Sequence, residues 1–204
     1  LARATLRLGD AAGALHILDA LDQAQPGWEP SEQGGRTLLR VEVLLSLERF
    51  QDAADQLEEH AEQLDPLSAR EVATLRARAL EGAGFAEEAS RAWLLAARDA
   101  LGPARADAYR AAVRASEQAR DPLGVLYAAR EAQAAGFGTL VAEAAARARI
   151  TLGVRAEPDG STPASELRIA TAERWLDKRE LERAADELAP LFAGRDTLAV
   201  QASA

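Results

Sequence analysis

The fold follows from one phrase of the chain, Arg49-Phe50-Gln51-Asp52-Ala53-Ala54-Asp55-Gln56-Leu57, and from its copies. The phrase consists of a tight turn, a large apolar residue, an acidic first turn of helix, and then a small residue followed by an apolar one. Similar phrases stand at residues 180–188 and 84–92, and a fainter one stands at 9–17. A phrase that recurs in this way predicts a chain built from repeated helical hairpins.

Each part of the phrase has a physical role in such a hairpin. The large residue, which is Phe50, Phe85 or Leu181, is expected to pack the turn against the hairpin core. The acids of the first turn suit the positive end of the helix dipole. The small residue lets two helix axes approach closely. We align this residue as Ala14, Ala54, Ala89 and Ala185, of which the first three are 40 and 35 residues apart.

The rest of the chain is also predicted to be helical, so the fold class is all-α. Ala, Leu, Arg, Glu and Gln dominate the sequence, and apolar residues recur at spacings of three and four. Gly and Pro divide the chain into short pieces. We expect helices near residues 2–8, 11–24, 32–48, 51–64, 67–82, 86–101, 104–119, 122–135, 139–152, 164–177, 180–193 and from about 196.

Composition narrows the classes of function. The 204 residues are 48% hydrophobic and 28% charged, and the formal net charge is −9. No apolar run reaches the roughly 18 residues of a spanning helix, so no membrane insertion is expected. Net negative charge opposes phosphate binding, so no nucleic-acid partner is expected. With no Cys and two His, the sequence predicts no disulfide, no metal site and no cofactor.

Side chains that could carry chemistry are explained more simply by the helices. The paired carboxylates Glu58 and Glu59 are expected on a solvated face, so we assign no catalytic residue. His16 lies among apolar residues and is expected to be half-buried, whereas His60 is expected to be exposed.

The tryptophans could serve as rigid platforms for a ligand. Trp93 and Trp175 lie inside amphipathic helices, which favours a place in the core. Trp28 lies in the loop Pro26-Gly27-Trp28-Glu29-Pro30, where we expect it to be partly exposed or to cap the first hairpin.

The turn residue and the small residue four positions later resemble part of the signature of the tetratricopeptide-like family. The family's first-helix phrase, Trp-x-x-Leu-Gly-x-x-Tyr, is absent. The resemblance implies an α-solenoid of antiparallel helical hairpins in a right-handed superhelix. We expect one such domain over residues 1–204, with a loop insertion at 153–163. Because the chain does not begin with Met, we expect it to be excised from a longer protein.

Charge is divided unevenly between the helices. Residues 51–65 contain acids and no base, whereas residues 104–120 and 140–150 contain more Arg than acid. The resemblance places first helices on the concave surface, which predicts a groove for anionic or carboxylate-bearing ligands. A GC-rich genome would explain the same excess of Arg equally well. The candidate partner-binding residues are Arg105, Arg110, Arg114 and Arg147.

A second resemblance concerns residues 168–179 and 184–191, which look like the superhelical N-terminal region of bacterial soluble lytic transglycosylases. It implies a non-catalytic scaffold within a periplasmic enzyme that acts on peptidoglycan. That family's catalytic Glu lies in a Glu-Ser motif, and this chain contains no Glu-Ser dipeptide, so no catalytic residue is carried over. The alternative is a cytoplasmic or periplasmic adaptor of the tetratricopeptide type that binds a protein or peptide on its concave face.

Overall fold

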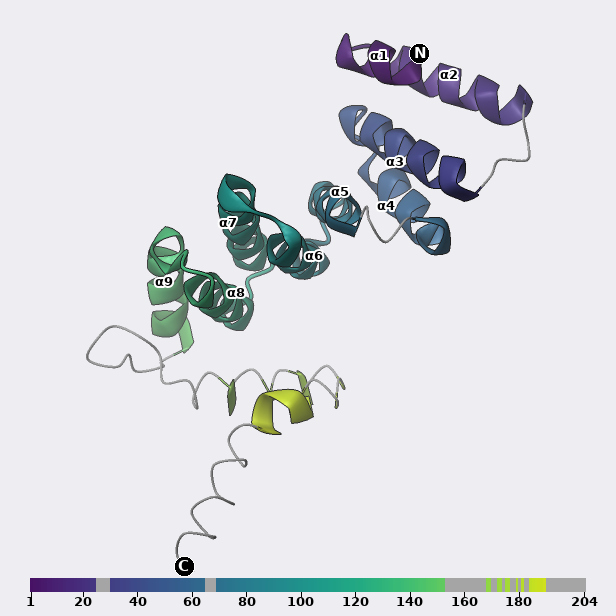
Figure 1. Cartoon of the computed structure of the whole chain (residues 1–204). Coiled ribbons are helices and arrows are strands. Elements are labelled where there is room, and N and C mark those ends of the chain that lie inside the picture. Colours follow the sequence, from purple (N-terminus) through teal and green to yellow (C-terminus); the bar gives the residue numbers. More distant parts are fainter. Residues whose placement is uncertain are drawn as a thin grey trace, which may run out of the picture. The chain divides into compact units, whose positions relative to one another are not determined.

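The computed structural model describes residues 1–24, 30–64 and 69–152, together with the short pieces 168–169, 172–173, 175–176, 179, 181 and 184–189. These described residues contain helices and turns and no strand (Figure 1), which confirms the predicted all-α class. The elements are α1 (Ala2–Arg7), α2 (Ala11–Ala24), α3 (Pro30–Ser46), α4 (Phe50–Glu59), η1 (Ala61–Gln63), α5 (Ala69–Gly82), α6 (Ala86–Asp99), α7 (Gly102–Gln118), α8 (Pro122–Ala134), η3 (Gly138–Leu140) and α9 (Ala142–Leu152).

The chain divides into two compact units, Leu1–Ala119 and Arg120–Ala204. In the first unit each helix packs against the next one in sequence, from α1 through α7, and α3 also contacts α5. In the second unit α8 packs against α9 and η3. Contacts between sequence neighbours fit a helical array, in which each helix is stabilised mainly by the two that flank it.

The turns that enter α2, α4, α6 and α8 share one backbone geometry. Each contains a residue with a positive φ, namely Gly9 (86°), Glu48 (57°), Gly84 (86°) and Arg120 (54°). These residues are 39, 36 and 36 positions apart. In the first three turns the next backbone N–H donates to the carbonyl five residues earlier, which is the Schellman closure of a helix. The bonds are Asp10 N to Thr5 O (3.2 Å), Arg49 N to Leu44 O (2.9 Å) and Phe85 N to Leu80 O (2.9 Å).

Buried positions recur at fixed distances from this left-handed residue. Five residues after it lie Ala14, Ala53 and Ala89, each 0% exposed, and Val125, 2% exposed. Nine residues after it lie Leu18 and Leu57, which are buried, and Trp93, which is half-buried. Seven residues before it lie Ala2, Val41, Ala77 and Val113, which are all buried.

This register corrects our alignment of the small residues by one position in two copies. Ala54 is only half-buried and Ala185 is exposed, whereas their neighbours Ala53 and Ala184 are buried. The reason is geometric, because successive helical residues point about 100° apart, so Ala53 lies within the core cluster while Ala54 is only partly buried against it.

The aromatic turn residues are therefore not equivalent to each other. Phe85 is the N-cap of α6 and is 44% exposed, so it does not pack the turn as expected. Phe50 is the first residue of α4 and packs against the core around Leu44 and Leu57. Its ring lies so close to Gly82 that a Cβ there would meet it at 2.3 Å.

The core of the first unit consists of small, closely packed interfaces. One cluster joins α3, α4 and α5 through residues that include Leu38, Val41, Leu57 and Leu75. A second cluster joins α1, α2 and α3 around Leu18. Between α6 and α7 the contact is made largely by alanines, and helix axes can approach closely where side chains are this small.

Most expected helices in the described part of the chain lie where the sequence predicts them, and two are shorter. The helix expected over 139–152 begins at Ala142, after the 3₁₀ turn η3. The helix expected over 51–64 ends at Glu59 and is followed by the 3₁₀ turn η1. The backbone N–H of His60 still bonds Gln56 O at 3.3 Å, and the residues beyond it do not continue the α-helical pattern. The loop insertion at 153–163 and the helix from about 196 lie outside the described residues. The single domain over 1–204 stays a prediction.

Candidate functional site

A groove runs along α2, α3 and α4. It consists of two adjoining hollows of about 390 and 460 Å³, which share Asp19, Arg40 and Gln56 in their linings. The second helices α2 and α4 contribute its walls, and α3 contributes residues between them. The lining residues are Leu15, Asp19, Asp22, Gln23, Arg40, Leu44, Arg49, Asp52, Asp55, Gln56, Glu59 and His60.

Helical spacing places these side chains together. On α2, Asp19 and Asp22 are three residues apart and follow Leu18, which is buried toward α3. On α3, Arg36 and Arg40 are four residues apart on the side that faces α2. Two acids on one helix thus meet two bases on the next helix.

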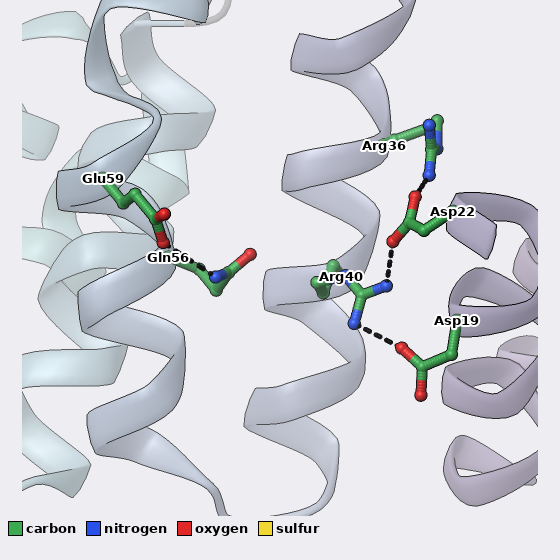
Figure 2. Close-up of polar contacts among 6 residues, drawn as sticks. All are labelled: Asp19, Asp22, Arg36, Arg40, Gln56 and Glu59. Carbon is green, nitrogen blue, oxygen red and sulfur yellow. Dashed lines mark hydrogen bonds and ion pairs between the residues drawn. The ribbon is translucent and has the colours of Figure 1, made fainter. Parts of the chain in front are cut away.

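Arg40 is the centre of the polar network on this side of the groove. Its Nη1 donates to Asp19 Oδ1 at 2.7 Å and its Nη2 donates to Asp22 Oδ2 at 2.5 Å, as Figure 2 shows. Arg36 forms an ion pair with the other oxygen of Asp22. The Arg40 side chain is 20% exposed, whereas those of Asp19 and Asp22 are 48% and 45% exposed, so the pairs lie at the outer edge of the contact between α2 and α3. The network fixes the position of α2 relative to α3.

The electrostatics of the two arginines are coupled. Burial, and secondarily the neighbouring positive charge of Arg40, lower the pKa of the Arg36 guanidinium from its ordinary value. The carboxylate of Asp22 lies against both guanidiniums and offsets this repulsion.

The wall formed by α4 is acidic. The Nε of Arg49 donates to Asp52 Oδ2 at 2.6 Å, and the Nε2 of Gln51 donates to Asp55 Oδ1 at 2.9 Å. Further along the helix, Gln56 Nε2 lies 3.4 Å from Glu59 Oε2 (Figure 2). All of these contacts are made within α4 or with its N-cap, so they do not hold α4 to α2.

The lining carries more negative than positive charge. Its five carboxylates outnumber its two guanidiniums, and the apolar side chains of Leu15 and Leu44 lie among them. A concave surface with charges of one sign in excess concentrates the field and attracts ions of the opposite sign. The arrangement therefore favours a cationic group with an apolar neighbour.

Arg105, the first candidate from the sequence, is used within the fold. Its Nε donates to the carbonyls of Ala97 (3.1 Å) and Ala100 (2.7 Å), and its Nη2 donates to that of Arg98 (3.0 Å). These are carbonyls at the end of α6 that the helix itself cannot satisfy. Arg105 thus caps one helix from the start of the next.

The other three candidates form ion pairs within the chain. Arg110 binds Asp107 at 2.5 Å and Arg147 binds Glu143 at 2.8 Å, each within one helix. Arg114 of α7 binds Glu81 of α5, with its Nη2 at 2.9 Å. Arg105, Arg110 and Arg114 share α7, whereas Arg147 belongs to α9 in the second unit.

Glu81 links three helices. Besides Arg114, its carboxylate accepts the indole N–H of Trp93 from α6 at 3.0 Å. Trp93 occupies the position that the buried Leu18 and Leu57 occupy in earlier repeats, but Trp93 is only half-buried. Trp28 lies outside the described residues.

Both histidine expectations are wrong. His16 is exposed, because α2 buries the face that carries Ala14 and Leu18, and His16, midway between them in sequence, points away from that face. His60 is half-buried at the end of α4, where its Nδ1 lies 3.1 Å from Gln56 O and its ring lines the groove.

Sequence reasoning did not find the groove. It identified the acidic character of residues 51–65 but placed the ligand surface on the first helices. A usable signal was present: acids three apart on one helix precede bases four apart on the next, which predicts pairing across the two helices.

Among the described residues, no group of three or more His, Cys, Asp or Glu is arranged to hold a metal ion. In the same part of the chain, no helix combines the length and apolar character needed to cross a bilayer. Comparison of the chain with protein-family models, curated proteins and solved structures finds no match.

Proposed function

We propose that this protein is a non-catalytic helical-repeat scaffold that binds a protein or peptide partner, and that its hairpins form a tetratricopeptide-like α-solenoid with a right-handed superhelical turn. Two observations support the repeat: the left-handed residues at the turns that enter α2, α4, α6 and α8 are 36 to 39 positions apart, and a buried residue lies five positions after each of these four. Arrays of this kind present extended surfaces on which partners bind.

The groove along α2, α3 and α4 is the observation that carries the proposal. Its excess of carboxylates beside Leu15 and Leu44 suits a segment with Lys or Arg next to an apolar residue. Asp55 and Glu59 are exposed on the α4 wall, where they can receive cationic side chains without disturbing the Arg40 network. The partner segment is therefore basic.

Binding of short peptides tests this proposal directly. Fluorescence anisotropy would compare a labelled peptide of alternating Lys and Leu with one of alternating Glu and Leu. We expect saturable binding of the first peptide only. Equal binding of both peptides, or of neither, would contradict the proposed groove.

A matched pair of variants locates the site. Asp55→Asn with Glu59→Gln removes two charges from the α4 wall, whereas Glu71→Gln with Glu88→Gln removes two from exposed positions outside the lining. The first pair should weaken binding of the Lys peptide at least about tenfold, which corresponds to about 1.4 kcal/mol. The second pair should weaken it much less.

The resemblance of residues 168–179 and 184–191 supports a second proposal, that the scaffold belongs to a periplasmic lytic transglycosylase and contacts peptidoglycan. Cosedimentation with purified peptidoglycan at moderate salt tests it. Retention of the parent chain and loss by competition with soluble peptidoglycan fragments are the expected results. A chain that stays in the supernatant would argue for an adaptor of protein partners.

A further inference from the structure

We infer that residues 49–84 form one exchangeable unit of the array, and that this unit carries the acidic wall of the groove. Its limits are set by the left-handed residues Glu48 and Gly84, which are 36 positions apart and have the same turn geometry. In both turns the backbone N–H of the next residue, Arg49 or Phe85, donates to the carbonyl five residues earlier in the preceding helix. Removal of these 36 residues would join two equivalent points of the backbone.

The helices on either side of the junction are compatible. Without residues 49–84, α3 would precede α6 as α5 does now, with Val41 at the position of Ala77 and Leu44 at that of Leu80. Val41, Leu44 and Ala77 are all buried in the present structure, so the substituted positions are core positions in both helices. The buried Ala89 of α6 would lie five residues after the left-handed Glu48, as Ala53 does now.

Contacts in the first unit are confined mainly to neighbours, so the excision leaves the interfaces outside the removed residues in place. The contacts of α2 with α3 and of α6 with α7 do not involve the removed residues. The losses are the two interfaces of α4, the contacts of α5 with α3 and α6, and the bonds of Glu81 with Trp93 and Arg114. A new interface between α3 and α6 would have to replace the one between α5 and α6. In an array of this type, stability is close to a sum over units and their interfaces.

The deletion also replaces the wall of the groove, because α6 would take the place of α4. At the positions where α4 has Asp55 and Glu59, α6 has Arg91 and Leu95. The shortened chain would keep the Arg40 network with α2 and lose the acidic side that faces it. The preference for a basic segment would then reside in one unit of the array, and this second part of the inference rests on the proposed function.

Two deletions in the full chain test the inference. Deletion of 49–84 keeps the register, whereas deletion of 49–86 places Arg91 at the buried position of Ala89. By circular dichroism and urea unfolding, we expect the first variant to keep the parent's helix content per residue and a cooperative transition, and the second to lose the transition. Cooperative unfolding of both deletions would overturn the exchangeable unit, because register would then not matter.

A duplication variant is the control for a deletion variant that does not fold only because Val41 is larger than Ala77. A second copy of residues 49–84 inserted after Gly84 adds a unit with native sequence, and we expect cooperative unfolding with a midpoint no lower than that of the parent. Failure of both the deletion and the duplication would overturn the inference.

Peptide binding separates the two parts of the inference. A folded 49–84 deletion that no longer binds the Lys peptide supports the placement of the acidic wall in this unit. A folded deletion that binds as the parent does would overturn that placement and leave the exchangeable unit intact. If the parent itself binds neither peptide, the proposed function fails while the folding result still stands.

Discussion

At the turns that enter α2, α4, α6 and α8, a left-handed residue stands at a fixed distance from the buried side chains of the following helix. Gly9 and Gly84 adopt this conformation without a steric penalty, and a Cβ on either would meet no atom within 4 Å. Glu48 and Arg120 adopt it with a Cβ present, at a cost of roughly 1–2 kcal/mol. The repeat is therefore maintained at these two turns by the packing of the helices they join.

Replacement of Glu48 with Gly should stabilise the protein. Relief of the left-handed strain exceeds the entropy that Gly adds to the unfolded chain, and we expect the free energy of unfolding to rise by about 1 kcal/mol. Chemical denaturation would measure it. Gly84→Ala is the reciprocal control, which should lower stability by a similar amount; an unchanged midpoint for both would contradict the account.

A buried pair of hydroxyls between α6 and α7 predicts a coupled response. Ser90 Oγ and Ser116 Oγ are 2.7 Å apart and both side chains are buried. Each single change to Ala leaves one buried hydroxyl without this bond, at a cost of about 1–3 kcal/mol. The double variant should cost less than the sum of the singles. Simple additivity in thermal unfolding would rule out an energetically significant bond.

At the scale of elements, several helix ends are held by side chains that lie outside the helix. The end of α6 is held by Arg105 from α7, and the end of α5 is covered by Phe50 from α4. Asp121 caps the start of α8, accepting the N–H of Gly124 at 2.9 Å. These contacts explain how short helices persist in a chain with few large core residues.

The register of α4 can be tested at two adjacent alanines. Ala53 is fully buried against α3 and α5, whereas Ala54 is only half-buried. Ala53→Leu should overpack this interface and reduce stability by about 1–3 kcal/mol, and Ala54→Leu should have a smaller effect. The two midpoints of urea unfolding give the comparison. The opposite order would restore the alignment that places Ala54 in the core.

The arginines of α7 should differ in their effect on stability. Arg105→Ala leaves three carbonyls at the end of α6 without a donor, so we expect a loss of about 1–2 kcal/mol. Arg110→Ala removes an exposed pair within one helix and should cost less than about 0.5 kcal/mol. Equal losses of stability in differential scanning calorimetry would show that the cap formed by Arg105 contributes no more than the exposed ion pair of Arg110.

At the scale of the whole molecule, the net charge of −9 and the acidic lining act in the same direction. Both favour the approach of cationic segments at low ionic strength. The helices themselves are joined by buried apolar residues such as Leu18 and Val43, so their packing should depend little on salt.

Salt should therefore weaken binding of the proposed basic segment without unfolding the protein. As ionic strength rises to about 0.15 M the Debye length falls to about 8 Å, so the affinity for a Lys and Leu peptide should drop. Anisotropy titrations at several salt concentrations, with circular dichroism in parallel, would measure both effects. A salt-independent affinity would indicate that apolar contact, and not charge, drives binding.

The sequence by itself determined that the chain is helical and where most helices begin and end, because Gly, Pro and helical periodicity are local signals. Only the tertiary structure decided which of two adjacent alanines is buried, since Ala53 and Ala54 are chemically identical and differ only in direction. It also decided that Arg105 binds carbonyls of α6, that acids of α2 bind Arg40, and that acids of α4 line the same groove. Such pairings depend on the packing of separate helices, which no single segment of sequence encodes.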